Sequence, residues 1–259
     1  MDLQLRGKRA LVTGSTRGIG FAIAEALAGE GAAVIVNGRD ADRTRAAGER
    51  LRERVPGADV AALPGDVADP AGIADLPEVD ILVNNAGLFA LTDFATLGDD
   101  EWQRYLDVNL LSAVRLSREL LPGMLERGWG RIVNIASESG VNVPAEMIPY
   151  GVTKAAMIAL GNGLAKLTRG TAVTVNTVLG GPTYSDGVAS VVESLAAAQG
   201  APADAIKAAV IGENRTSLLE RFIEPDEIAN LAIYLASPLS SATNGAALRA
   251  DGGVLTTIL

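Results

Sequence analysis

Residues 13–20, Thr13-Gly14-Ser15-Thr16-Arg17-Gly18-Ile19-Gly20, follow a short apolar run and lead directly into a segment with helical periodicity. In this strand, turn and helix context, glycines permit a tight turn and a close approach of the backbone to a phosphate. The start of the helix adds free N–H groups and positive dipole potential. The spacing is Gly-x3-Gly-x-Gly, whereas the general dinucleotide fingerprint is Gly-x-Gly-x-x-Gly. The stretch predicts a dinucleotide-binding turn, with an ordinary glycine-rich turn as the alternative.

Short runs rich in valine and isoleucine alternate with longer stretches of helical periodicity along the chain. The predicted strands span residues 9–13, 33–37, 60–63, 80–84, 131–136, 173–178 and 246–250. The predicted helices span residues 19–29, 40–54, 99–127, 149–169 and 225–236. Near-continuous hydrophobicity is typical of parallel strands that are buried on both faces. We therefore predict an α/β fold with a Rossmann-type, doubly wound parallel sheet of about seven strands and helices on both faces.

Residues 185–212 interrupt this alternation with two alanine-rich helical patches, which Gly200 and Pro202 separate. The segment is too long for a plain connection, and we expect it to form a lid over a ligand. The sequence contains no internal repeat and no linker. We expect one dinucleotide-binding domain spanning residues 1–259, with the lid at about residues 185–212.

The composition restricts the possible chemistry. The chain has no histidine and no cysteine, which excludes a Ser-His-Asp hydrolase, a thiolate nucleophile and the usual zinc sites. We therefore predict no metal site and expect catalysis to use serine, tyrosine, lysine, carboxylates or a cofactor. The net charge of -9 disfavours nucleic acid and anionic membranes as partners. Residues 1–6 lack a signal-peptide core and no apolar run is long enough to span a membrane, so we expect a cytoplasmic protein.

Tyr150 and Lys154 lie four positions apart on a predicted helix and share one face of it. A phenol is a poor base at neutral pH, and a neighbouring ammonium group that favours phenolate is what such chemistry requires. By itself this spacing is more often a buried tyrosine beside a lysine with a packed stem. Ser137 adds weight, because it ends a predicted strand at the edge where open α/β sheets bind ligands. Ser139 is its rival, and Ser137 itself could be an ordinary turn residue.

The ordered series of motifs resembles the short-chain dehydrogenase/reductase family over almost the whole chain, including members that act as 3-oxoacyl-carrier-protein reductases. Residues 13–20 match its cofactor turn, Asp66-Val67 stands where the family contacts adenine, and Asn84-Asn85-Ala86-Gly87 matches its motif after the fourth strand. Tyr150-Gly151-Val152-Thr153-Lys154 supplies the family's Tyr-x3-Lys, and residues 236–253 resemble its C-terminal signature.

The resemblance implies an active-site tetrad of Asn109, Ser137, Tyr150 and Lys154. Ser137 would hydrogen-bond the substrate oxygen, and Tyr150 would be the acid in reduction and the base in oxidation. Lys154 would lower the tyrosine pKa and hold the nicotinamide ribose, while Asn109 would hold a water that links Lys154 to solvent. The implied dinucleotide-binding residues are Gly14, Ser15, Thr16, Arg17, Gly18, Ile19, Gly20, Gly38, Arg39, Asp66, Val67, Asn85, Ala86, Gly87, Tyr150, Lys154, Gly181, Thr183 and Ser185.

The end of the second predicted strand indicates which dinucleotide binds. An acidic residue there would bind the ribose hydroxyls of NAD and repel a 2′-phosphate. Gly38 occupies that position, Arg39 follows it, and Arg17 is a second cation that could approach the same phosphate. We therefore prefer NADP(H), with NAD(H) possible. The alternative is that Arg39 lies on a solvated helix start.

Two segments depart from the family pattern. The stretch between Asp66-Val67 and residue 80 is short, so its helix, around residues 70–75, can have only a turn or two. Gly180 stands where the family has proline, ahead of Gly181, Thr183 and Ser185. Because glycine lacks the fixed φ of proline, we expect a looser lid hinge and a weaker grip on the cofactor.

The leading functional prediction is an NADP(H)-dependent carbonyl reductase or alcohol dehydrogenase. A narrower alternative is a 3-oxoacyl-carrier-protein reductase, with Arg127 and Arg169 as docking cations, although two acidic proteins repel each other. A different class is a non-catalytic NADP-binding regulator, because fold alone does not establish activity. We expect an apolar small-molecule substrate held by Val141, Val143, Met147, Tyr184 and the lid. The resemblance also implies a homotetramer, or a dimer.

Overall fold

The computed structural model describes residues 2–73, 76–213 and 216–258. Its centre is a sheet of seven parallel strands in the order β3-β2-β1-β4-β5-β6-β7. The strands are β1 Arg9–Val12, β2 Ala33–Gly38, β3 Val60–Pro64, β4 Ile81–Asn84, β5 Trp129–Ser137, β6 Ala172–Gly180 and β7 Ala247–Ala250. The predicted α/β fold is confirmed, and each predicted strand overlaps an observed one.

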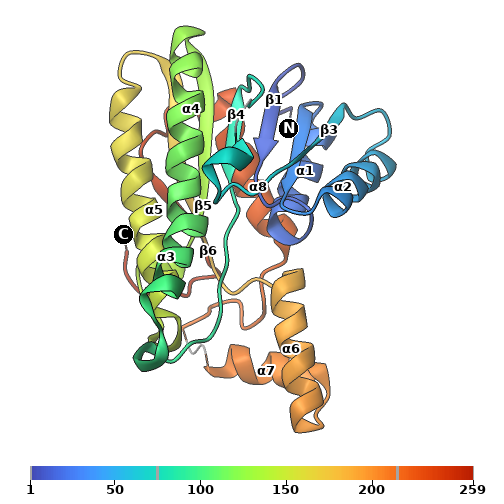
Figure 1. Ribbon diagram of the computed structural model, residues 1–259, viewed down its shortest axis with the longest axis vertical. Helices are drawn as coiled ribbons and strands as arrows, with labels where there is room; N and C mark the ends of the chain where they lie inside the picture. The colour runs from blue at the N-terminus through green and yellow to red at the C-terminus, as the bar shows by residue number, and fades with distance from the viewer. Residues whose placement is uncertain (1, 74–75, 214–215, 259) are drawn as a thin grey trace.

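Helices cover both faces of the sheet (Figure 1). The helices of one face are α1 Gly18–Gly29, α2 Ala41–Arg54 and α8 Pro225–Ala236, which pack on strand residues such as Val12. The other face carries α4 Ser112–Glu126 and α5 Ile148–Leu167, which pack on residues such as Leu11. Neighbouring residues of one strand therefore enter different halves of the core. This explains why the strands are apolar runs rather than alternating sequences.

The order of the strands reverses between β1 and β4, which are neighbours in the sheet. The connections that follow these two strands pass to opposite faces, so a crevice opens at their carboxyl ends. The turn at residues 13–20 follows β1, and Asn85 follows β4 directly. The fold thus brings both predicted cofactor motifs to one edge of the sheet.

The helix that we predicted over residues 99–127 is interrupted. A π-helical segment, Asp107–Leu111, joins α3 Asp99–Leu106 to α4 and contains Asn109. Such a segment inserts an extra residue into a helix and often marks a functional site. The hydrophobic pattern continues through it, so the periodicity of the sequence could not reveal it.

The predicted lid consists of two helices that extend away from the sheet (Figure 1). They are α6 Asp186–Gln199 and α7 Ala203–Glu213, and Val192 and Ile206 pack between them. Gly200 ends α6 with a left-handed φ of 62°, a conformation that glycine adopts without steric cost. The division of this segment into two helices is confirmed.

The connection after β3 is short, as predicted. A single 3-10 turn, Pro70–Ile73, replaces the helix expected around residues 70–75, and residues 74 and 75 of that prediction lie outside the described part of the chain. Among the described helices, none combines the length and the apolar character needed to cross a membrane.

Candidate active site

A groove of about 1200 Å³ crosses the carboxyl edge of the sheet. The predicted dinucleotide-binding residues that line it are Gly14, Thr16, Arg17, Gly18, Gly38, Arg39, Asp66, Val67, Asn85, Ala86 and Gly87. Ser15 and Gly20 are buried beneath this lining, and Ile19 packs against the apolar core. The groove has room for an elongated ligand such as a dinucleotide.

The glycines of the turn are required by its geometry. Gly14 and Gly18 both have φ near +60°, where other residues are strained. A Cβ at Gly14 would lie 2.9 Å from the Cα of Ala86, and one at Gly20 would lie 2.4 Å from Nδ2 of Asn85. The spacing of the glycines therefore follows from close packing of the turn on the loop after β4.

Hydrogen bonds lock these two loops together. Thr13 Oγ1 accepts the backbone N–H groups of Asn85 at 3.0 Å and of Ala86 at 2.9 Å. In return, Asn85 Nδ2 donates to the carbonyl oxygens of Thr13 at 2.9 Å and Gly14 at 3.2 Å. The turn is thus held in shape by side chains that do not themselves need to touch a ligand.

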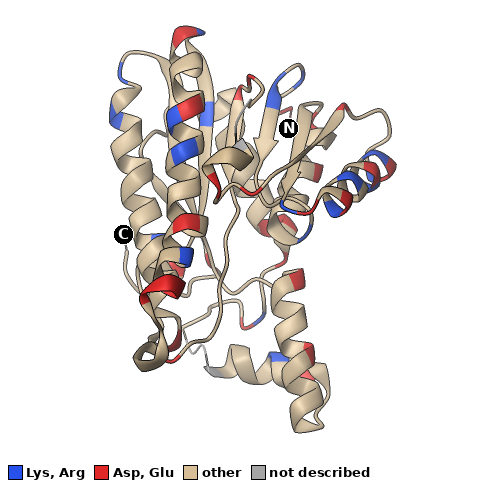
Figure 2. Ribbon diagram, viewed as in Figure 1, with Lys and Arg blue, Asp and Glu red and all other residues tan. Residues whose placement is uncertain are grey.

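One end of the groove is rich in arginine, and Figure 2 shows the basic residues along α2. Arg50 donates to the carbonyl of Thr16 at 2.9 Å, and Arg54 pairs with Glu25 at 3.1 Å. The three other arginines of this cluster bind none of the described residues through their guanidinium groups, and they are Arg17, Arg39 and Arg43. Arg43 was missed in the sequence, although it lies one helical turn beyond Arg39.

The packing around Gly38 excludes a side chain there. A Cβ at this position would lie 2.5 Å from Cγ2 of Thr16 and 2.9 Å from Oγ1 of Thr44. An acidic residue could not be accommodated without displacing Thr16. The arginine-rich end therefore has the charge and the space for a phosphate, and the dinucleotide fits the residues present.

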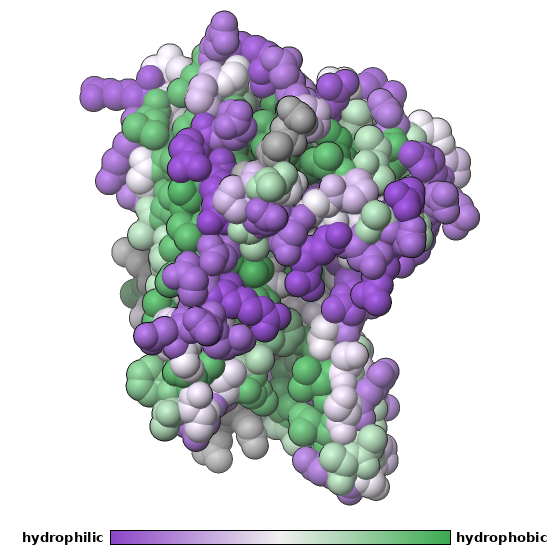
Figure 3. Space-filling view, viewed as in Figure 1, coloured by the Kyte–Doolittle hydropathy of each residue, from purple (hydrophilic) through white to green (hydrophobic). Residues whose placement is uncertain are grey.

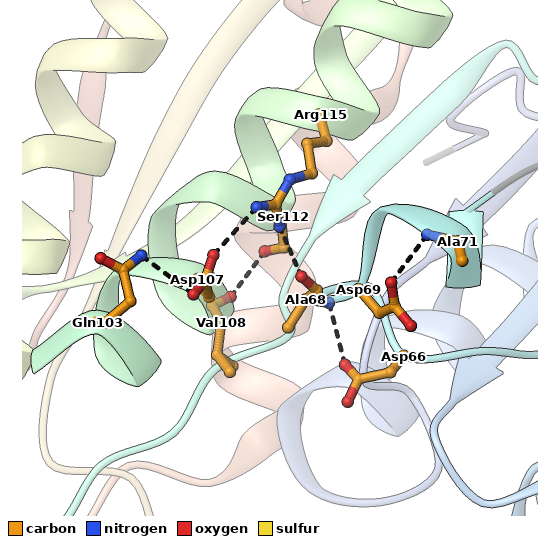
Figure 4. Close-up of polar contacts among 9 residues, drawn as sticks. All are labelled: Asp66, Ala68, Asp69, Ala71, Gln103, Asp107, Val108, Ser112 and Arg115. Atoms are coloured by element: carbon orange, nitrogen blue, oxygen red, sulfur yellow. Dashed lines mark hydrogen bonds and ion pairs between the residues drawn. The ribbon is translucent and has the colours of Figure 1, made fainter. Parts of the chain in front are cut away.

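The loop that carries Asp66 is tied to the π-helical segment (Figure 4). Arg115 donates to the carbonyl of Ala68 at 2.6 Å and to Asp107 at 3.0 Å. Asp107 also accepts from Gln103 at 3.1 Å, and hydrogen bonds from Gln103 and Arg115 lower its pKa. The network connects the predicted adenine contact to the segment that positions Asn109.

Helix α5 lies unusually close to the end of β5. A Cβ at Gly140 would lie 2.8 Å from the backbone nitrogen of Ala155, and one at Gly151 would lie 2.8 Å from the carbonyl oxygen of Ser139. Both glycines thus allow α5 to approach the turn that follows Ser137. This packing brings Tyr150 to Ser137, the last residue of β5.

Ser137 and Tyr150 interact through their hydroxyl groups. Burial raises the pKa of Tyr150, hydrogen bonding to Ser137 lowers it, and the charge of Glu138 raises it. The net direction is upward, so the phenol is neutral at physiological pH. Ser139, the rival of Ser137, is instead buried within the turn η4 Glu138–Gly140.

Lys154 lies one helical turn beyond Tyr150, with Nζ 5.5 Å from the centre of the phenol ring. Its Nζ donates to the carbonyl of Ile135 at 2.8 Å. Burial lowers the pKa of Lys154 to about 8. The expected effect of this ammonium on Tyr150 therefore does not outweigh burial, which moves both groups towards their neutral forms.

Asn109 is buried beside the same cluster. Its Nδ2 donates to Leu88 O and Thr153 Oγ1, both at 3.0 Å, and its Oδ1 accepts from Leu88 N at 2.8 Å. Gly87 lies beside both Asn109 and Lys154. A Cβ added at Gly87 would lie 3.5 Å from Asn109 Oδ1 and 3.6 Å from Lys154 Nζ. Both amide hydrogens of Asn109 are thus engaged, and its predicted contact with a water remains a prediction.

An aromatic side chain lies beside Tyr150, and a separate cavity with charged residues lies beside the lid. Phe89, which the sequence did not single out, lies edge-on to Tyr150 with ring centres 6.2 Å apart. Figure 3 shows apolar surface where the lid helices meet the rest of the molecule. A second cavity of about 680 Å³ beside the lid is lined by Tyr184 together with Lys207, Glu220 and Arg221. The apolar substrate wall that we expected from Val141, Val143 and Met147 stays a prediction.

The lid begins close to the glycine turn. Asp186 Oδ2 accepts the N–H of Gly18 at 2.6 Å, and Ser185 lies beside the same glycine. The Thr183 hydroxyl, expected to face the cofactor, donates to the carbonyl of Gly181 at 2.9 Å. Gly180 pairs with β5 on one side and β7 on the other, which limits the freedom that we expected there.

Arg127 and Arg169 lie far from this edge. Arg127 follows α4 and donates to the carbonyl of Val79 at 2.8 Å. Arg169 follows α5 in the turn before β6. Helices that return antiparallel to the strands end at the opposite edge of a parallel sheet. The two arginines therefore do not flank the mouth of the groove.

Comparison with known proteins identifies relatives along the whole chain. Residues 8–196 match the family model described as short chain dehydrogenase. Oxidoreductase YvrD of Bacillus subtilis is 46% identical, over 98% of this chain and 99% of its own. D-beta-hydroxybutyrate dehydrogenase of Cupriavidus necator is 37% identical, over 96% and 98%. The crystal structure of L-sorbose reductase from Gluconobacter frateurii, complexed with NADPH and L-sorbose, has a TM-score of 0.94 at 34% identity, covering 100% of both chains.

We expect Gly151→Ala to lower kcat by about 100-fold, because an added methyl group would displace α5 and misalign Tyr150 with Ser137. A Cβ there would lie 2.5 Å from Val143, and such overpacking costs about 1 to 3 kcal/mol of unfolding free energy. Gly163→Ala is the control on the same helix, because nothing lies within 4 Å of its Cβ position. Steady-state kinetics and thermal unfolding measure both effects. Equal kcat values for the two variants would contradict the packing argument.

Proposed function

Because the chain belongs to the short chain dehydrogenase family, we propose that it is an NADP(H)-dependent carbonyl reductase or alcohol dehydrogenase. The observation that carries this proposal is the convergence of Ser137, Tyr150 and Lys154 beside Gly87, which lines the groove. The arginine-rich end of the groove, beside Gly38, supports NADP(H) over NAD(H). The NADPH bound to the sorbose reductase supports the same choice.

When bound, NADPH would supply the hydride to the carbonyl carbon. Ser137 donates a hydrogen bond to the carbonyl oxygen and aligns it with Tyr150. Tyr150 transfers its hydroxyl proton to that oxygen as the alcohol forms, and in oxidation it accepts the proton instead. Lys154 has hydrogens beyond the one given to Ile135, and it would use them to hold the nicotinamide ribose.

The proposal extends to the outline of the enzyme. Residues 1–259 would form one cytoplasmic domain that assembles as a homotetramer or dimer, and residues 185–212 would close over the substrate. Phe89 and Val143 suit an apolar part of a ketone, whereas the charged residues near Tyr184 suit polar groups at its far end. A panel of L-sorbose, acetoacetate and an acetoacetyl thioester covers these possibilities.

Two alternatives are less well supported. A 3-oxoacyl-carrier-protein reductase would not use Arg127 and Arg169 for docking, because both lie at the opposite edge of the sheet. A non-catalytic NADP-binding regulator would not need Ser137, Tyr150 and Lys154 together. NADPH consumption with the ketone panel separates the classes, since binding without turnover would favour the regulator.

Tyr150→Phe removes the hydroxyl group that transfers the proton. We expect kcat/KM for ketone reduction to fall by about 100-fold to 10,000-fold, while NADPH binding is largely retained. Tyr234→Phe is the control, because this tyrosine is exposed on α8. Absorbance assays measure turnover and fluorescence measures binding. If the Tyr150→Phe variant retains activity, the proposed proton transfer by Tyr150 is wrong.

Arg39→Ala and Arg43→Ala should each weaken NADPH binding by about tenfold or more, because a charge-assisted hydrogen bond to the 2′-phosphate is lost. NADH binding should change little in either variant. Arg45→Ala is the matched control, since Arg45 lies on the same helix and pairs with Asp42 outside the groove. Titration calorimetry gives the affinities. A wild-type protein that binds NADH more tightly than NADPH would contradict the assignment.

A further inference from the structure

Glu138 shares the hydrogen bonds of the Ser137 hydroxyl group. Its Oε2 is hydrogen-bonded to Ser137 Oγ and accepts the N–H of Ser139 at 2.8 Å. The same N–H reaches Ser137 Oγ at 3.1 Å. Glu138 is half-buried in the turn η4 that follows β5. A carboxyl group is therefore built into the surroundings of the hydroxyl proposed to hold the substrate oxygen.

The contact with Glu138 matters because the Ser137 hydroxyl group can form only a few hydrogen bonds. A serine hydroxyl has one hydrogen to donate and two lone pairs. One lone pair takes the N–H of Ser139. An ionised Glu138 can only accept, so the hydrogen of Ser137 points to it. The other lone pair is then available to the hydroxyl of Tyr150, and neither hydrogen is directed at a substrate oxygen.

A neutral Glu138 reverses this arrangement. Its carboxyl O–H donates to the second lone pair of Ser137, which frees the Ser137 hydrogen for the substrate. Tyr150 loses Ser137 as an acceptor, so its own hydrogen also becomes available. We propose that Glu138 is a positioning residue that gates Ser137, which means that its protonation decides where the Ser137 hydrogen points. When Glu138 is neutral, the hydroxyl groups of Ser137 and Tyr150 can both donate to the substrate and support carbonyl reduction. When Glu138 is ionised, neither hydroxyl group is directed at the substrate. The inference rests on the proposed function of Ser137 and Tyr150.

The surroundings of Glu138 favour its neutral form. Burial raises the pKa of Glu138 and the charge of Asp251 adds to this, while hydrogen bonds from Ser137 and Ser139 only partly oppose it. On α5, Tyr150 is neutral at physiological pH and Lys154 Nζ is turned to Ile135. Gly180 and Gly181, on the neighbouring strand end, carry no charge. The pKa of Glu138 is thus moved upward from the usual carboxyl range.

The test is the pH dependence of kcat/KM for ketone reduction at saturating NADPH. The neutral form is present below the pKa of Glu138, so activity should fall as the pH rises through that value. Loss of one donor to a developing oxyanion typically costs about 100-fold. Glu138→Gln cannot ionise, so its profile should lack this fall and keep only the changes at higher pH that belong to Lys154 and Tyr150.

Control variants distinguish the proposed effect of Glu138 ionisation from a purely structural effect of replacing Glu138. Glu126→Gln changes an exposed residue at the far end of α4 and should retain the wild-type profile. In a Ser137→Ala background the fall should be absent, and adding Glu138→Gln should change nothing. If Glu138→Gln does not bind NADPH, Glu138→Met replaces it, because methionine has similar length, cannot ionise and accepts hydrogen bonds only weakly.

The outcomes separate this inference from the proposed function. A wild-type profile without the fall, or an unchanged fall in the Glu138 variant, would overturn the gate. If Tyr150→Phe abolishes turnover while Glu138→Gln leaves the profile unchanged, the proposed function stands and only the gate is rejected. Turnover that is insensitive to Tyr150→Phe rejects the proposed function itself.

Discussion

The close approach of α5 to the end of β5 is the constraint on which the site depends. Gly140 and Gly151 bring the backbone of the helix and the backbone of the turn into contact. A side chain at either position would separate Ser137 from Tyr150, and reacting groups lose much of their effect when they are misplaced by about 1 Å. The hydroxyl groups are therefore positioned by steric fit between rigid elements.

Local charge resolves an apparent conflict between an acidic chain and a dinucleotide that carries several phosphates. The net charge is -9, yet Arg17, Arg39 and Arg43 all line the groove. At physiological ionic strength, charges beyond about 8 Å are largely screened. A phosphate in the groove therefore responds to the charges of the lining, which are these arginines and acidic residues such as Asp40, and little to charges elsewhere. The net charge affects the attraction of large partners such as nucleic acid. Binding of a phosphate in the groove depends on the charges of the residues that line it.

Much of the fold was predictable because buried parallel strands leave apolar runs and glycine turns leave fixed spacings. Ser137 was recognised from its place at a strand end, and Tyr150 and Lys154 from their shared helix face. Features that depend on tertiary neighbours were missed. The π-helical segment around Asn109 leaves the hydrophobic period unchanged. The sequence also does not show whether the carboxyl group of Glu138 contacts solvent or Ser137. The upward shift in the pKa of Tyr150 likewise requires knowledge of its burial.

Burial moves both Tyr150 and Lys154 towards their neutral forms. Burial raises the pKa of the tyrosine and lowers that of the lysine to about 8. As the pH rises, Lys154 loses its charge before Tyr150 ionises, so a phenolate would form without its neighbouring ammonium group. Oxidation needs that phenolate as a base, whereas reduction needs the neutral phenol as an acid. The neutral phenol is the form present at physiological pH, and it is the form that donates the proton when the proposed reaction runs as a reduction.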